Sequence, residues 1–252
     1  MGLAVPQRLE NYWKKEAKRY SMLVANSDVD QVMMAKSFSP KELDKVKVTG
    51  LPRHDIILME KKELPTSYAD TLTSIKKRLD GRKLVLFAPT WRYGNEKPCF
   101  FEVEELKRLE ALLIENNSVL GIRVHGNMLK GNTASYLSNN IIYLNDIPDV
   151  NVLLREVDCL ITDYSSIYLD FMCLNRAVIL YTPDIDKYKY NRGFNYTAEE
   201  FIPHNEFIDT FEKLESKLEN ILSDNYELDS SYWNVKNVFI NLRLIIIIRL
   251  VY

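Results

Sequence analysis

The chain has 252 residues, of which 46% are hydrophobic, and its 33 basic and 35 acidic side chains leave a formal net charge of -2. This composition supports a packed core and excludes a disordered chain, while the near balance of charge excludes a global field that would recruit nucleic acid. Three cysteines, at positions 99, 159 and 173, predict reduced thiols in a cytoplasmic setting and not a disulfide framework. The first 20 residues lack the apolar stretch of a signal peptide, and the apolar tail over 237–252 is too short to span a membrane.

Short apolar, β-branched runs alternate with longer segments of helical period, which is typical of βα units around a parallel sheet. Strands are expected over 21–25, 45–50, 83–89, 119–125, 141–144, 158–162 and 177–182. Helices are expected near 28–37, 67–80, 102–116, 149–156, 166–174 and 209–223. In the helix at 102–116, the period predicts a buried stripe made of Val103, Leu106, Leu109, Leu113 and Ile114. The sequence therefore predicts the α/β class.

A domain boundary is expected within 59–68, where a charged run and Pro65 interrupt the βα pattern. The segment before it, 1–64, contains only two expected strands, too few for a stable parallel sheet with both faces covered. It is either supported by the second domain, over 65–237, or is part of a larger domain. The residues over 238–252 form an atypical apolar tail.

The run "LVLFAPTWR" brings Thr90, Trp91 and Arg92 to the carboxyl end of a strand, where open α/β sheets bind ligands. Arg92 is suited to bidentate binding of a phosphate. The alternative is structural: Pro89 ends the strand, Trp91 packs in the core and Arg92 is solvated.

The strand in "GIRVHGNMLK" delivers His125 to the same edge of the sheet. A histidine there suits donation to a phosphate oxygen, or acid–base chemistry near neutral pH. A structural histidine after a strand is the competing interpretation.

The stretch "DCLITDYSSIYLDF" places Asp163, Ser165 and Ser166 between a strand and a helix. Amides and the helix dipole at such a turn favour an anion, and the serine hydroxyls add hydrogen-bond donors. Asp170 lies one turn after Ser166 on the same helix face. Helix capping would account for one of these residues but not for all of them.

The loop "YTPDIDKYKYNRGF" adds Arg192 next to Gly193 as a further candidate for ligand contact, whereas its lysines are typical of a solvated surface. The chain has no phosphate-binding P-loop motif and no dinucleotide fingerprint, and its His and Cys residues lack metal-ligand spacing, so no cofactor or metal is expected. His54 and His204 are expected at the surface.

The motifs "TGLPRHD", "LFAPTWR", "DYSSIYLDF" and "NRAVILYTPDIDKYKYNRGF", with the His125 strand, resemble the CDP-glycerol glycerophosphotransferase family of bacterial teichoic acid synthesis over roughly residues 20–225. The resemblance implies a glycosyltransferase-B-like fold. A C-terminal Rossmann-like domain with a parallel sheet would bind the nucleotide donor, and 1–64 would be a remnant of the N-terminal, acceptor-side α/β domain. The positions that match the nucleotide-donor motifs are Thr90, Arg92, His125, Asp163, Ser165, Ser166 and Asp170.

The sequence also departs from the family pattern. The family's W-H-G-T-P-L-K motif, whose histidine is the implied general base, ends where this chain begins, so we expect the base to be absent and turnover to be poor. Gly126 replaces the proline that usually follows the histidine, and "FIPHNEF" replaces a Pro-Gly-Pro turn. The tail does not resemble the family's closing helix, which indicates a truncated or frame-shifted gene.

The resemblance implies transfer of glycerol phosphate or ribitol phosphate from CDP-glycerol or CDP-ribitol to a lipid-linked polyol-phosphate acceptor, for cell-wall or capsule-type polymers. It also implies a cytoplasmic enzyme that is peripheral on the inner face of the membrane. Two alternatives stay open. One is a nucleotide-sugar glycosyltransferase of the same architecture, and the other is a non-catalytic fragment that binds the nucleotide donor.

Overall fold

The computed structural model describes residues 12, 15–16, 18–38, 43–90, 101–124, 136–191, 207–223 and 225–240. The protein divides into two compact units, one formed by Met1–Asp55, Asp186–His204 and Asp229–Tyr252 and the other by Ile56–Ile185 and Asn205–Leu228. The domain boundaries expected from the sequence, at 64/65 and 237/238, stay a prediction.

The larger unit contains a six-stranded parallel sheet with the order β5-β4-β3-β6-β7-β8. Its strands are β3 (Lys83–Phe87), β4 (Ser118–Ile122), β5 (Ile141–Tyr143), β6 (Cys159–Thr162), β7 (Ala177–Tyr181) and β8 (Phe207–Ile208). The chain adds two strands on one side of β3 and then crosses to the other side to form β6. In open α/β sheets, the crevice at such a reversal, here between β3 and β6, is where ligands bind.

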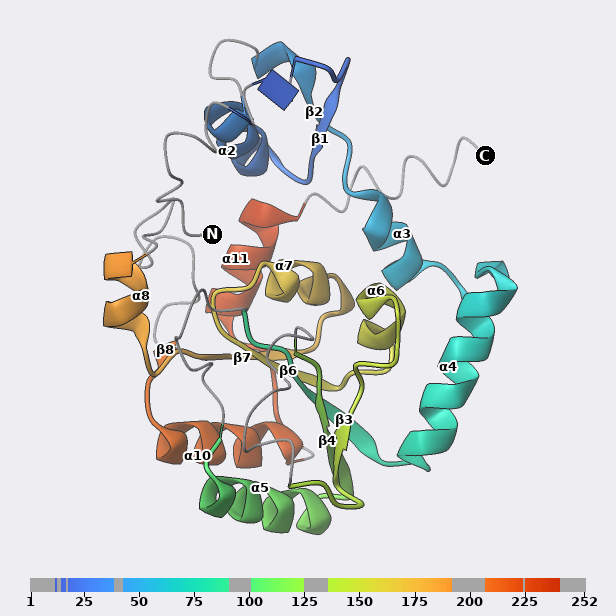
Figure 1. The fold of residues 1–252 in the computed structure, drawn as a ribbon, viewed down its shortest axis with the longest axis vertical. Helices are drawn as coiled ribbons and strands as arrows, with labels where there is room; N and C mark the ends of the chain where they lie inside the picture. Colours follow the sequence, from blue (N-terminus) through green and yellow to red (C-terminus); the bar gives the residue numbers. More distant parts are fainter. Residues whose placement is uncertain are drawn as a thin grey trace. The chain divides into compact units, whose positions relative to one another are not determined.

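Helices cover both faces of this sheet, and the strands are accordingly buried on both sides. Five helices surround it: α4 (Thr66–Leu79), α5 (Val103–Glu115), α6 (Val150–Leu154), α7 (Ile167–Phe171) and α10 (Phe211–Leu222). Helices α5 and α10 lie side by side on one face, and α6 and α7 lie on the other (Figure 1). Alternate strand residues such as Val85, Phe87 and Ile161 pack with the inner faces of α5 and α10 in one core cluster.

Helix α5 begins with a capping box in which Glu102 and Glu105 satisfy each other's backbone amides. Its buried stripe differs from the expected one at three positions. Leu106, Leu109 and Leu113 are buried as expected, but Leu112 joins them, while Val103 and Ile114 are 44% and 60% exposed. The expectation was wrong at those two positions because they lie at the edges of the apolar stripe, where periodicity alone cannot separate core from surface.

The smaller unit contains a two-stranded parallel sheet of β1 (Leu23–Ala25) and β2 (Val46–Val48), with α2 (Asp28–Phe38) packed on both strands. A second helix of this unit, α11 (Ser230–Phe239), contacts α2. The Asn26 side chain donates to the Phe239 carbonyl at 2.8 Å, which ties the end of α11 to the turn after β1. Helix α2 thus covers the sheet, and a segment more than 200 residues away in the chain packs on α2 and on the turn after β1.

Two helices span the division between the units, α3 (Pro52–Leu58) and α8 (Ile185–Asn191). Neither was expected from the sequence, and neither were α11 and β8. The prediction of a surface His54 was wrong: His54 lies in the first turn of α3 and is fully buried. The prediction rested on the lack of partners for His54 in the sequence, whereas its burial follows from α3, a helix that the sequence did not predict. His204 lies outside the described residues.

Candidate functional site

The ends of β3 and β6 are joined by consecutive hydrogen bonds. The Ala88 amide donates to the Ile161 carbonyl at 2.9 Å, and the Thr162 hydroxyl donates to the Ala88 carbonyl at 2.6 Å. Beyond the sheet, the Thr90 amide donates to Asp163 Oδ1 at 2.8 Å. Thr90 and Asp163, which lie 73 residues apart in sequence, are therefore neighbours at the point where the strand order reverses.

The turn after β6 carries the two expected serines. The Ser165 hydroxyl accepts a hydrogen bond from the Ile167 amide at 3.4 Å, whereas Ser166 is the N-cap of α7 without a side-chain cap bond. Both serines are partly exposed, and Asp170 is buried within α7. Helix α7 has five residues and continues directly as a 3-10 helix over Met172–Leu174, so helical structure covers nearly all of the range expected over 166–174. The serine hydroxyls lie beside the first turn of this helix, and anion binding there stays a prediction.

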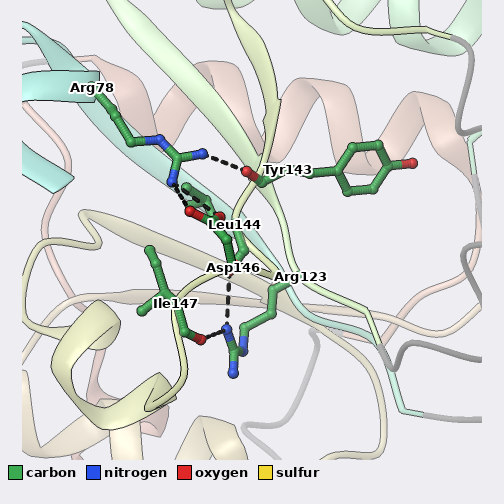
Figure 2. A network of polar contacts seen from close by, with 6 residues as sticks. All are labelled: Arg78, Arg123, Tyr143, Leu144, Asp146 and Ile147. Atoms are coloured by element: carbon green, nitrogen blue, oxygen red, sulfur yellow. Dashed lines mark hydrogen bonds and ion pairs between the residues drawn. The ribbon is translucent and has the colours of Figure 1, made fainter. Parts of the chain in front are cut away.

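The end of β4 is held by a different kind of contact (Figure 2). The Arg123 guanidinium donates to the carbonyls of Leu144, Ile147 and Pro148 in the loop after β5. Burial lowers the pKa of Arg123, and the nearby carboxylates of Asp149 and Asp146 oppose that effect. The Arg123 guanidinium therefore has a structural role, because its hydrogen bonds hold the loop after β5.

Two further side chains fix the same loop. Arg78, from α4, binds both carboxylate oxygens of Asp146, at 3.1 and 2.8 Å, and the Tyr143 carbonyl (Figure 2). Asn145 pairs with the backbone of Val124 through both its amide oxygen and its amide nitrogen. The residue directly before His125 is therefore anchored.

The structure brings together some of the expected site residues and says nothing about others. Thr90 and Asp163 are in contact, and Ser165, Ser166 and Asp170 follow in the same turn and helix. Three other candidates, Arg92, His125 and Arg192, lie outside the described residues, so their convergence on this site stays a prediction.

Sequence reasoning missed two residues of this region. The Tyr164 hydroxyl donates to Asp184 Oδ1 at 2.9 Å, which connects the turn after β6 to the loop after β7. Tyr164 lies inside the quoted serine motif, and Asp184 lies inside the quoted "YTPD" stretch, so the motifs themselves were the available signal. The sequence pattern alone gives Tyr164 no role separate from its neighbours in the motif.

Metal or thiol chemistry gains no support from the described part of the chain. No group of three or more His, Cys, Asp or Glu residues there is arranged to hold a metal ion. Cys159 and Cys173 are buried, as expected for core thiols. Burial raises the pKa of the Cys159 thiol, which disfavours the reactive thiolate. Cys99 lies outside the described residues.

The known proteins that this chain resembles are enzymes of teichoic acid synthesis. The family model described as CDP-Glycerol:Poly(glycerophosphate) glycerophosphotransferase matches residues 1–243. The teichoic acid ribitol-phosphate polymerase TarL of Staphylococcus aureus is 30% identical over 211 residues, which cover 81% of this chain and 36% of TarL. A teichoic acid poly(glycerol phosphate) polymerase of Bacillus spizizenii is 30% identical over 210 residues, which cover 80% of this chain and 51% of that protein.

Among solved structures, the wall teichoic acid polymerase TagF matches with a TM-score of 0.74 and 24% identity, over 99% of this chain and 63% of the TagF chain. This likeness confirms the expected α/β, glycosyltransferase-B-like fold class. The chain spans about a third to a half of the length of the curated relatives named above. Since the family model covers nearly the whole sequence, the chain belongs to the CDP-glycerol:poly(glycerophosphate) glycerophosphotransferase family.

Proposed function

We propose that this chain binds the nucleotide donor in the transfer of glycerol phosphate, or ribitol phosphate, from a CDP-activated polyol to a lipid-linked polyol-phosphate acceptor. Family membership supports this proposal. So do the names of relatives that polymerise glycerol phosphate and ribitol phosphate, and a structure of a TagF variant soaked with CDPG. In the reaction, an acceptor hydroxyl attacks the β-phosphate, the bond to the bridging oxygen breaks, and CMP leaves with that oxygen.

The observation that carries the proposal is the contact between the Thr90 amide and Asp163 at the β3–β6 reversal. It fixes the loop after β3 against the turn that bears Ser165 and Ser166, at the edge where parallel α/β sheets bind nucleotides. The serine hydroxyls there would donate to phosphate oxygens. Because phosphoryl transfer depends on positioning and on stabilising the phosphate charge, such donors are the groups the chemistry requires.

Other residues have proposed roles that come from sequence alone. Arg92, His125 and Arg192 would place positive charge or hydrogen-bond donors beside the diphosphate. Asp170, which is buried in α7, would stabilise the turn. The rival interpretations are a nucleotide-sugar glycosyltransferase and a fragment that binds the nucleotide donor without turnover. The likeness to TagF does not separate them, because at 24% identity it concerns the fold.

Isothermal titration calorimetry of the full chain tests the proposal. CDP-glycerol, CDP-ribitol and CMP are compared with UDP-glucose, and we expect the cytidine compounds to bind and UDP-glucose not to bind. Replacing both hydroxyls, Ser165→Ala with Ser166→Ala, is expected to weaken binding about tenfold, as loss of hydrogen bonds to a charged group does. Ser223→Ala at the exposed end of α10 is the matched control, since its hydroxyl donates only to the nearby Asn220 carbonyl. Tighter binding of UDP-glucose would contradict the proposal.

We infer further that the intact enzyme works at the cytoplasmic face of the membrane, because its proposed acceptor carries a lipid. No helix in the described ranges is long and apolar enough to cross a bilayer. We propose that the association is peripheral, and co-sedimentation with anionic phospholipid vesicles at low and high salt tests it. Binding that is lost at high salt is expected, and no binding at low salt would contradict the inference.

A further inference from the structure

Tyr164 lies in the middle of the candidate turn, between Asp163 and the two serines. Its side chain is 7% exposed, and its hydroxyl donates to Asp184 Oδ1 at 2.9 Å. Asp184 follows β7 and directly precedes α8. A phenol bound to a carboxylate is a charge-assisted hydrogen bond, stronger than one between neutral groups. The turn after β6 is therefore bonded to the loop after the next strand in the sheet.

Two consecutive side chains, those of Asp163 and Tyr164, attach this turn to two other segments, and Ser165 adds a local bond within the turn. Asp163 accepts from the Thr90 amide after β3, Tyr164 donates to the loop after β7, and Ser165 accepts from an amide at the start of α7. Because the Asp163 and Tyr164 attachments belong to separate segments, they restrict the backbone of the turn more than either would alone. We propose that the Tyr164–Asp184 hydrogen bond is a positioning contact that sets the orientation of the Ser165 and Ser166 hydroxyls toward the phosphates of the nucleotide donor.

This inference rests on the proposed function, since it takes the ligand of the turn to be a CDP-activated polyol. It adds a role for two residues that touch the turn and not the reacting atoms. The buried Tyr164 ring provides the packing, whereas its hydroxyl provides the orientation. Tyr164→Phe separates these roles because it keeps the ring and removes only the hydrogen bond, and the partly exposed Asp184 can then be solvated.

The larger unit offers a matched control. The Tyr136 hydroxyl donates to Glu110 Oε2 at 2.7 Å, so it is also a tyrosine–carboxylate pair. Tyr136 lies in the segment that leads into the amino end of β5, whereas the candidate site lies at the carboxyl ends of β3 and β6. The Ser138 hydroxyl, two residues on, accepts from the amides of residues 140 and 141 at the start of β5, and Asn140 donates to the first residue of β4. Tyr136→Phe therefore removes the same type of bond away from the strand ends that form the candidate site.

Hydrogen exchange measured by mass spectrometry tests the positioning step on the full chain without ligand. In Tyr164→Phe, peptides covering residues 163–168 are expected to exchange about fivefold faster, the change expected when one hydrogen bond of about 1 kcal/mol is lost. Peptides over α5 should be unchanged. In Tyr136→Phe, peptides over α5 should exchange faster and peptides over 163–168 should be unchanged. Unchanged exchange over 163–168 in Tyr164→Phe would overturn the inference whether or not a nucleotide binds.

Calorimetry with CDP-glycerol tests the step from turn to ligand. Tyr164→Phe is expected to weaken binding about fivefold, and Asp184→Ala at least as much, because Asp184 has a further contact. The double variant should bind no more weakly than Asp184→Ala alone, because the Tyr164–Asp184 bond is already lost there. Asp184→Asn keeps an acceptor and should stay within about twofold of the wild type. Tyr136→Phe should bind as the wild type does.

The outcomes separate the two proposals. If the wild-type chain fails to bind CDP-glycerol, the proposed function is contradicted, and the exchange data alone still decide whether the pair holds the turn. If the wild type binds and Tyr164→Phe binds equally well despite faster exchange over 163–168, the role in positioning the nucleotide donor is overturned. Additive losses in the double variant would overturn the role of the shared bond.

Discussion

The strands β4 and β6 lie on either side of β3, yet the polar side chains at their ends are used in different ways. At the end of β4, Arg123 donates to three backbone carbonyls of one loop, and Asn145 pairs with the backbone of Val124. At the end of β6, Asp163 and Tyr164 bind the neighbouring loops, and two serines beside them stay partly exposed. The first region is a scaffold, and the second leaves hydrogen-bonding groups partly exposed at the proposed donor site.

The difference follows from the chemistry of the residues. A guanidinium has five donors and no acceptor, so it can satisfy several carbonyls of an irregular loop at once. The loop after β5 has such carbonyls, and Arg123 and Arg78 together serve them (Figure 2). A serine hydroxyl has one donor and two acceptor sites on a short side chain, so it retains capacity after one local bond. Ser165 keeps its donor after accepting from the Ile167 amide.

The largest expected effect tests the scaffold. Arg123→Met removes the contacts to the Leu144, Ile147 and Pro148 carbonyls. Hydrogen bonds from a charged group are each worth about 1.5–3 kcal/mol, but water can bind the freed carbonyls and recover part of that. We therefore expect the free energy of unfolding to fall by about 3 kcal/mol. Arg78→Met is the control on the same loop. Its partner Asp146 has a side chain 68% exposed, so a loss of about 1 kcal/mol is expected. Urea denaturation followed by circular dichroism measures both, and equal losses would contradict the distinction.

A smaller effect tests the end of β6 against that of β7. Thr162 and Thr182 are both fully buried at the ends of these neighbouring strands. The Thr162 hydroxyl donates to the Ala88 carbonyl, whereas the Thr182 hydroxyl has no hydrogen-bond partner in the described part of the chain. Valine has nearly the same shape. Thr162→Val is therefore expected to cost about 1–2 kcal/mol, because it leaves a buried carbonyl with one bond fewer, and Thr182→Val to be neutral or stabilising by up to about 1 kcal/mol. Thermal unfolding of the two variants side by side measures the contrast, and similar losses would show that the Thr182 hydroxyl is bonded in solution.

Sequence patterns predicted the buried elements well and the connections poorly. The strands of the main sheet have continuous apolar runs because both faces are covered, and the long helices show a clear period. Strand β8 has two residues and α3 has seven, too few for either signal, and the burial of His54 follows from α3. The order of strands depends on crossovers that no local pattern records. The sequence therefore predicted which residues follow strand ends, but not that β3 and β6 would be adjacent.

The site shows the same limit. Placing Thr90 and Asp163 at one edge followed from the parallel sheet, and their contact agrees with it. The Tyr164–Asp184 bond joins residues 20 apart in sequence across two loops, and the geometry of loops is set by tertiary contacts that spacing does not reveal. For Arg123, the sequence showed a charge near the end of a strand, and only the structure shows that backbone carbonyls occupy it.

The smallest expected effect concerns the Tyr136–Glu110 pair, near the amino end of β5. Its stability tests how much a tyrosine–carboxylate bond such as Tyr164–Asp184 can contribute. Hydrogen bonds from the Ser138 and Tyr136 hydroxyls hold the pKa of Glu110 below its ordinary value, against the opposing effect of burial. A carboxyl whose pKa is lower in the folded state stabilises the fold at pH values above its unfolded pKa, about 4.3, and that contribution is lost as the pH falls through the folded pKa.

We therefore expect the stability difference between the wild type and Glu110→Gln to be largest near neutral pH and to shrink as the pH falls through the lowered pKa of Glu110. The difference should be small because Glu110 is close to solvent, where screening weakens such pairs. Urea midpoints at neutral and acidic pH measure it, and a difference that grows on acidification would have the wrong sign. If the difference is present at neutral pH, a hydroxyl–carboxylate bond stabilises this fold even near water. Tyr164 is the more buried of the two tyrosines, and its hydroxyl should then hold its turn at least as firmly.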